Sequence, residues 1–218
     1  GPKLSLEDRR MNTFKLLLTS VFMMLALISC VDIEVQFILK RDGKGYLELT
    51  YDMDVEATTL LDANDQRPAI PLPITRQDFE AALSGADGLK MRRFRRSDDE
   101  EGVHISARIS FDSGVALRSI AGFESLLVSY EADGHGGGVL SQRVIPEREL
   151  NKVPDQASIE FLRSIASESR ISFVVVAPAK IRSATGASVD SRGRTARFSR
   201  TLTDYLLEQG PVDLIIRW

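Results

Sequence analysis

The chain has almost none of the residues that build disulfides or zinc sites. Cys30 is the single cysteine among 218 residues, so no disulfide can form within the chain. The two histidines, His104 and His135, have no cysteine partners at zinc-ligand spacing. The motifs of zinc proteases, phosphate-binding loops and serine β-lactamases are also absent. The sequence therefore predicts no structural disulfide, no metal and no cofactor.

An apolar segment from Leu16 to Ile28 is too short for an ordinary membrane span, which needs about 20 apolar residues. Met11 and Lys15 precede it, and the small residue Ser29 follows it. A charged start, a short apolar run and a small residue are typical of a secretory signal peptide. We therefore expect a leader over residues 11–29, cleaved between Ser29 and Cys30. An uncleaved anchor or a buried helix are the alternatives.

The end of this leader carries the most specific motif in the chain. Leu27-Ile28-Ser29-Cys30 has the aliphatic, aliphatic, small, cysteine order of a lipobox. In this respect the sequence resembles the precursor of a bacterial envelope lipoprotein. The resemblance implies that Cys30 becomes the first residue and that acyl chains such as palmitate attach to its sulfur. An acylated Cys30 leaves no free thiol for catalysis, and it would hold the protein to a membrane.

The rest of the chain divides simply. Residues 1–10 lack an initiator methionine and carry two acids, so we interpret them as an upstream extension or a cloning scar. Residues 30–218 are expected to form the ectodomain, either as one compact domain or as two docked lobes. Val31 is not the acidic residue that retains many lipoproteins at the inner membrane. By resemblance to that sorting pathway, an outer membrane is favoured over other envelope locations such as the periplasmic face of an inner membrane.

The charge balance of the chain does not favour a nucleic-acid partner. The sequence holds 28 basic and 31 acidic residues, a formal net charge of −3. The predicted leader and extension contain four of the basic residues and two of the acidic ones, so the ectodomain is more acidic still. A broad basic face for nucleic acid is not expected from such a balance.

Hydrophobic alternation dominates the ectodomain. Apolar residues occupy every second position in residues 31–39, 47–55 and 103–111, the pattern of half-buried strands. Asp42 and Gly43 lie between the first two segments, as in a β-hairpin turn. Further strands are predicted at residues 89–96, 126–131, 139–145, 195–199 and 212–218. The continuous apolar run over residues 171–177 is typical of a central strand.

Helices are predicted between these hairpins. Thr75 and Asp78 are placed to cap a helix that contains Phe79, Ala82 and Leu83 and ends at Gly85. Further helices are predicted over about 113–121, 155–169 and 202–208. Hairpin followed by helix predicts an α+β fold, in which antiparallel sheet is built from β-hairpins and the helices pack on one face.

The two ends of the ectodomain also resemble a known family. The segment Cys30-Val31-Asp32 continues through residues 33–37 to the Asp42-Gly43-Lys44-Gly45 turn, and it looks like the start of LppM-like bacterial lipoproteins. Residues 173–180, followed by Gly186, Arg194 and Phe198, are similar to the closing strands of that family. The resemblance implies an envelope lipoprotein with an α+β ectodomain that contacts lipid or host molecules.

A cluster of cations is the sharpest binding feature. Five basic residues stand within seven positions, interleaved with Met91 and Phe94: Lys90, Arg92, Arg93, Arg95 and Arg96. On a regular strand, Lys90, Arg92, Phe94 and Arg96 share one face, which suits lipid headgroups or another anionic ligand. The alternative is that the acidic residues 98–101 neutralise this cluster across the hairpin.

Catalytic signals are weak by comparison. His135 precedes three glycines, as in the oxyanion loop of some esterases, but no Gly-x-Ser-x-Gly motif accompanies it. A glycine-rich hairpin loop is therefore the expected structure. His104 is expected to be an exposed residue of a polar strand face. Carboxylate pairs such as Asp52/Asp54 and Asp62/Asp65 carry no motif of their own.

These observations predict a membrane-anchored lipoprotein without enzymatic activity. Its ectodomain would bind a lipid, an envelope component or a partner protein at the membrane surface. Two further functions stay open at this point: a carboxylate-based hydrolase acting on envelope polymers, and a surface lipoprotein that engages a host. The sequence does not indicate an oligomeric state.

Overall fold

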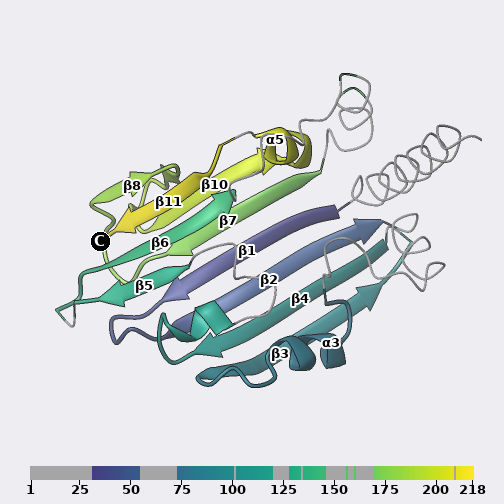
Figure 1. The fold of residues 1–218 in the computed structure, drawn as a ribbon, viewed down its shortest axis with the longest axis horizontal. Coiled ribbons are helices and arrows are strands. Elements are labelled where there is room, and N and C mark those ends of the chain that lie inside the picture. Colours follow the sequence, from purple (N-terminus) through teal and green to yellow (C-terminus); the bar gives the residue numbers. More distant parts are fainter. Residues whose placement is uncertain are drawn as a thin grey trace, which may run out of the picture.

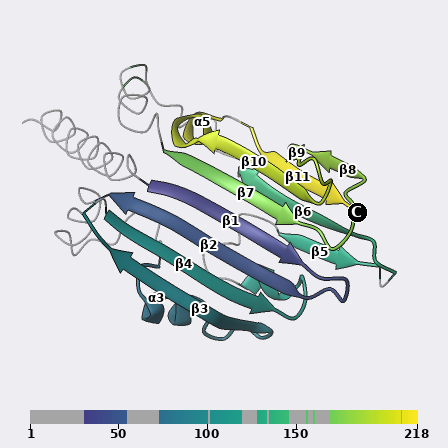
Figure 2. The ribbon, with the colours of Figure 1, turned by 180° about the vertical axis from the view of Figure 1, so that it is seen from behind.

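The computed structural model describes residues 31–54, 73–100, 102–119, 128–133, 135–145, 156, 160, 169–208 and 210–218. These residues form two β-sheets, two short α-helices and one turn of 3-10 helix (Figures 1 and 2). The predicted leader, the cleavage site at Ser29 and Cys30, and most of the helix predicted over residues 155–169 lie outside the described residues.

The strands are distributed over a seven-stranded large sheet and a four-stranded small sheet. The large sheet contains, in spatial order, β3 (Leu89–Asp98), β4 (Gly102–Phe111), β2 (Gly45–Asp54), β1 (Val31–Leu39), β7 (Arg170–Val176), β10 (Thr195–Thr201) and β9 (Ser188–Val189). The small sheet contains, in order, β5 (Ser129–Ala132), β6 (Gly138–Ile145), β11 (Val212–Arg217) and β8 (Ser183–Thr185).

The first hairpin forms where the sequence predicts it. Strands β1 and β2 pair from Val31 opposite Met53 to Leu39 opposite Gly45. Gly43 adopts a φ of 81° in the turn, a conformation that costs glycine little. Gly45 lies so close to Phe111 and the Ile38 carbonyl that an added Cβ would come within 2.5 Å of both. The turn and the first pair of β2 therefore depend on glycine.

The pairing of β1 with β7 departs from the prediction of antiparallel sheet. β7 lies beside β1 as a parallel neighbour, with Ile33 opposite Ile171 and Ile38 opposite Val176. Parallel neighbours need a long crossover, and here the whole of β2 to β6 separates the two strands. Residues 171–175 are all buried. The prediction of a central strand in this segment is confirmed, because β7 has β1 on one side and β10 on the other.

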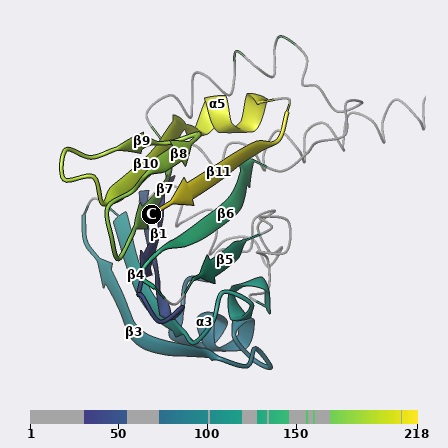
Figure 3. The same cartoon turned by 90° about the vertical axis from the view of Figure 1, so that its left-hand side faces the viewer.

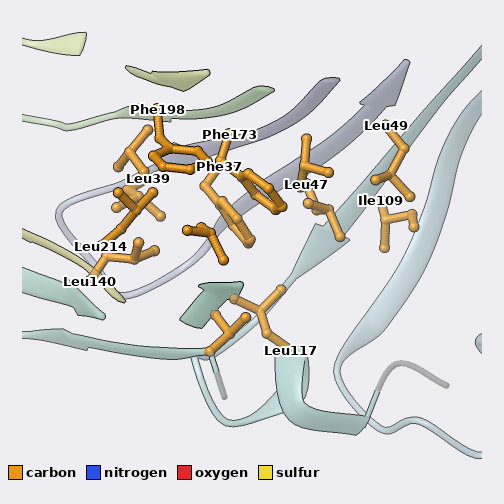
Figure 4. Packing of buried hydrophobic residues seen from close by; sticks show 14 of the residues in the cluster. Phe37, Leu39, Leu47, Leu49, Ile109, Leu117, Leu140, Phe173, Phe198 and Leu214 are labelled. Carbon is orange, nitrogen blue, oxygen red and sulfur yellow. The ribbon is translucent and has the colours of Figure 1, made fainter. Parts of the chain in front are cut away.

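The hydrophobic core lies between the two sheets. Seen from the side, the small sheet faces one surface of the large sheet (Figure 3). Phe37, Phe173 and Phe198 of the large sheet belong to the same buried cluster as Leu140 and Leu214 of the small sheet (Figure 4). Among the described residues, the strands of the small sheet thus cover one face of the large sheet. Helices packed over one face, as the sequence predicts, are not confirmed.

The helices of the structure are short. α3 (Arg76–Ala82) begins with the predicted cap: the Asp78 amide donates to Thr75 Oγ1 over 3.1 Å, and the Thr75 amide donates to Asp78 Oδ2 over 2.8 Å. α5 (Leu202–Leu207) also lies where it is predicted. The helix expected over 113–121 contains only the 3-10 turn η1 (Ala116–Ser119) within its described part.

Candidate functional site

The cationic cluster lies on β3, the outermost strand of the large sheet, and a β-bulge decides how it is presented. Met91 pairs with Ile109, and Arg93 pairs with Arg108, so Arg92 is an extra residue between them. A bulge shifts every later side chain to the opposite face from the one that strict alternation predicts. The five cations therefore do not lie as the sequence pattern suggests.

After the bulge, Phe94 and Arg96 face the interior side of the sheet. Phe94 pairs with buried Ala107, and its ring lies 5.6 Å from the ring of Phe79 in α3. Arg96 pairs with Ile105 on the same side. The prediction that Lys90, Arg92, Phe94 and Arg96 share a face is therefore wrong. The packing of Phe94 against the core selects the bulged register, because burying an aromatic ring outweighs regular alternation.

The same shift gathers four exposed cations on the opposite, outer surface of the sheet. Lys90, Arg93 and Arg95 pair with Ser110, Arg108 and Ser106 of β4, whose side chains point outward. Arg92 joins them, since its Nε donates to Ser110 Oγ over 2.8 Å. All four are exposed. We call Lys90, Arg92, Arg93 and Arg95 the cationic strip.

The acidic residues that follow the strip bind elsewhere. Asp98 Oδ1 accepts a hydrogen bond from Arg96 Nε over 2.9 Å, and this contact holds the pKa of Asp98 below its ordinary value. Asp99 Oδ2 lies 3.1 Å from His104 Nε2. Within the described part of the chain, no residue forms an ion pair with the cationic strip. Asp98 thus neutralises Arg96 along the same strand, and no described acidic residue neutralises the other four cations across the hairpin.

Other cations of the outer surface differ from the strip in being paired. Arg108 binds Glu48, and its guanidinium lies 5.4 Å from the ring centre of Tyr46. Arg197 of β10 binds Glu34 of β1 over 2.8 Å. The first pair joins the neighbouring strands β4 and β2, and the second reaches across β7, which lies between β10 and β1. Among the described residues the strip has no such partners, and β3 has a neighbouring strand on one side only.

His104 joins two carboxylates on the outer surface, which the sequence does not predict. Its Nδ1 lies 2.6 Å from Asp52 Oδ1, and its Nε2 lies 3.1 Å from Asp99 Oδ2. The hydrogen bond to Asp52, with the charges of Asp99 and Asp52, raises the pKa of His104 above its ordinary value. Only the strand register brings the two side chains together, since Asp52 of β2 is directly opposite His104 of β4.

The row that contains His104 also holds a serine. Ser97 of β3 is opposite His104, so Ser97, His104 and Asp52 lie across three adjacent strands. A hydrolytic triad needs a neutral imidazole nitrogen facing the serine. Here that nitrogen lies against Asp99, and the two carboxylates favour the protonated imidazolium. The arrangement suits a structural ion bridge better than a general base.

The interior contains a polar group without partners. Gln142 of β6 is fully buried, and neither its Nε2 nor its Oε1 has a hydrogen-bond partner. It faces the large sheet, because it pairs with buried Leu214 and lies between Leu140 and Val144 on its own strand. The Tyr51 hydroxyl and Trp218 Nε1 are also buried without partners. Burial raises the pKa of the Tyr51 hydroxyl.

The remaining predicted residues have ordinary roles or lie outside the described chain. His135 is exposed in the loop between β5 and β6, where its amide and that of Gly137 donate to Asp133 Oδ1. The described residues contain no group of three or more ligand-type side chains arranged to hold a metal ion. Asp62 and Asp65 lie outside the described residues, as does the predicted acylation site at Cys30.

No helix within the described ranges is both long enough and apolar enough to cross a membrane.

Comparison with known proteins gives a structural likeness but no match in sequence. No family model matches the chain, and no curated protein matches it. Among solved structures, the folded domain of the Mycobacterium tuberculosis LppM protein, determined by NMR, is similar over 86% of this chain and 88% of that chain. The sequence identity is 11% and the TM-score is 0.48. The chain thus shows a distant likeness to the LppM folded domain.

Proposed function

We propose that this protein is a membrane-anchored bacterial lipoprotein of the cell envelope, that it is not an enzyme, and that its ectodomain binds a lipid, an envelope component or a partner protein. Of these ligands, a lipid has the best support. The observation that carries this choice is the fully buried Gln142, with both amide atoms unpartnered between the two sheets.

The energetics of Gln142 argue for a ligand. Leaving a buried polar group without a hydrogen bond costs about 1–3 kcal/mol, and an apolar residue of similar size would avoid that cost. Ligand sites commonly combine an apolar lining with a few polar groups that orient the bound molecule. Apolar side chains around one amide that can both donate and accept would suit an acyl chain with a nearby ester or hydroxyl group.

The anchor places such a site beside the membrane. β1 begins at Val31, the residue directly after the proposed acylation site Cys30. So short a connection keeps the folded domain within a few residues of the lipid surface. Val31 in place of an acidic residue also supports an outer membrane in a double-membraned organism.

Retained lipid tests the proposed ligand. The full chain would be purified from membranes in a mild detergent and analysed by native mass spectrometry. We expect a bound lipid beyond the acyl chains on Cys30, and we expect Gln142→Met to lose most of it. Gln36→Met is the matched control, because Gln36 lies on the outer surface of β1. Equal lipid retention by both variants would contradict a site at Gln142.

The anchor is tested separately by intact mass. We expect a mature chain that starts at Cys30 and carries acyl chains, and we expect Cys30→Ala to abolish both processing and acylation. A full-length chain without acyl groups would remove the lipoprotein assignment.

A further inference from the structure

The cationic strip is a positively charged surface that the described chain leaves uncompensated. Lys90, Arg92, Arg93 and Arg95 extend outward from one strand, and no described residue forms an ion pair with them. The bulge that creates the strip places four like charges over six residues, at a cost in mutual repulsion. Bulges are frequent at sheet edges, where they re-aim side chains.

The position of the strip at the sheet edge determines what can reach it. β3 is the last strand of the large sheet, and Figures 1 and 2 show it along one border of the molecule. A flat surface can therefore touch β3 without touching the rest of the outer surface. That separation matters, because Asp32 and Asp52 lie on strands further into the sheet.

The strip also lies within reach of the proposed anchor. Arg95 is opposite Ser106, Ser106 is opposite Thr50, and Thr50 is opposite Glu34. Arg95 is therefore three strand spacings across the sheet from Glu34, and Asp32 is two residues further back along β1. Together these two displacements give a distance of roughly 16 Å between Arg95 and Asp32. Lys90 lies in the row of Ile38, about 20 Å further along β1 than Asp32. At these separations, a membrane that holds Cys30 can also meet the strip when the sheet tilts toward its β3 edge.

We propose that the cationic strip docks the ectodomain on the anionic lipid headgroups of the membrane that holds its acyl anchor. This inference rests on the proposed anchor at Cys30. The acyl chains supply attachment, and the strip fixes orientation.

Lys90 provides a direct readout, because it is the one lysine of the strip. The acylated full chain would be reconstituted in vesicles of phosphatidylcholine, with or without phosphatidylglycerol, and treated with a membrane-impermeant amine reagent. The modification of Lys90 relative to Lys180 would be measured by peptide mass spectrometry. We expect this ratio to fall severalfold on anionic vesicles only. We expect it to recover at about 1 M salt, where the Debye length is about 3 Å.

Matched charge variants isolate the strip. Arg93→Gln/Arg95→Gln keeps the Lys90 reporter and spares Arg92, which binds Ser110. A basic residue near an anionic surface contributes roughly fivefold to binding, so this pair should weaken docking by about thirtyfold and remove the protection of Lys90. The control Arg182→Gln/Arg192→Gln removes two exposed cations elsewhere and should leave the protection intact.

The outcomes separate docking from anchoring. Flotation with neutral vesicles reports the acyl anchor alone, so failure there counts against the proposed lipoprotein and not against the strip. A chain that floats only with anionic vesicles, with Lys90 protected, still supports docking by the strip. Unchanged reactivity of Lys90 on anionic vesicles overturns the docking proposal. Protection by soluble polyphosphate but not by vesicles also overturns it and assigns the strip to an anionic polymer.

Discussion

The two surfaces of the large sheet differ in how they treat polar groups. On the outer surface, His104, Arg108 and Arg197 each bind a carboxylate on another strand of the sheet. Between the two sheets, Gln142 is fully buried, and its side-chain amide has no hydrogen-bond partner. Water can satisfy an exposed side chain, so the outer pairs contribute little, whereas an unpaired buried amide is costly. Interior residues should therefore change the free energy of unfolding more than outer residues do, in either direction.

Neighbouring residues of β1 offer the strongest test of this difference. Phe37 is fully buried between the sheets, and Gln36 faces outward on the same strand. Phe37→Ala should lower the free energy of unfolding by about 3–5 kcal/mol, because it removes apolar burial and leaves a cavity. Gln36→Ala should change it by less than about 0.5 kcal/mol. Urea denaturation measures both, and similar values for the two variants would contradict the assignment of the surfaces.

A change of opposite sign is expected at Gln142. Gln142→Met removes the unpaired amide with little change of volume, so it should raise the free energy of unfolding by about 1–3 kcal/mol. Thermal unfolding of lipid-free protein measures this effect. If the variant is less stable in that state, the amide has a partner in the folded protein and the cost argued above does not exist.

A smaller effect is expected from the outer ion pairs. Glu34 and Arg197 are both partly exposed, and exposed pairs of this kind contribute about 0–1 kcal/mol. A double-mutant cycle with Glu34→Gln and Arg197→Gln should give a coupling energy in that range, reduced further in high salt. A coupling energy of several kcal/mol would show that the outer surface is less open to solvent than its exposure indicates.

The smallest effect should be visible only in its pH dependence. The pKa of His104 is raised in the folded protein by Asp52 and Asp99, so protonation stabilises the folded state. This stabilisation is complete below the unfolded pKa of about 6.5 and is lost as the pH rises through the folded value. His104→Gln should flatten the decrease in melting temperature over that interval, while His135→Gln should not. An unchanged slope in His104→Gln would assign the decrease to other groups.

The order of predictability follows from the range of the interactions. The first hairpin, the cap at Thr75 and the buried strand at residues 171–176 could be predicted because alternation and capping are local. The bulge at Arg92 could not, since it arises when Phe94 packs against Phe79 of a separate helix. The link between His104 and Asp52 depends on the register of two strands that are distant in sequence. Gln142 has no local signal, because its position within a strand does not say which sheet it faces.

The sequence by itself determined which segments become strands, where the short helices begin, and which residues supply positive charge. The tertiary structure alone decided that two sheets face one another, that β7 pairs parallel to β1, and that four of the five cations share one surface. The physical reason is common to all three. Local patterns fix the conformation of a segment, but the burial of apolar side chains from distant segments selects the register and partners that the segment finally adopts.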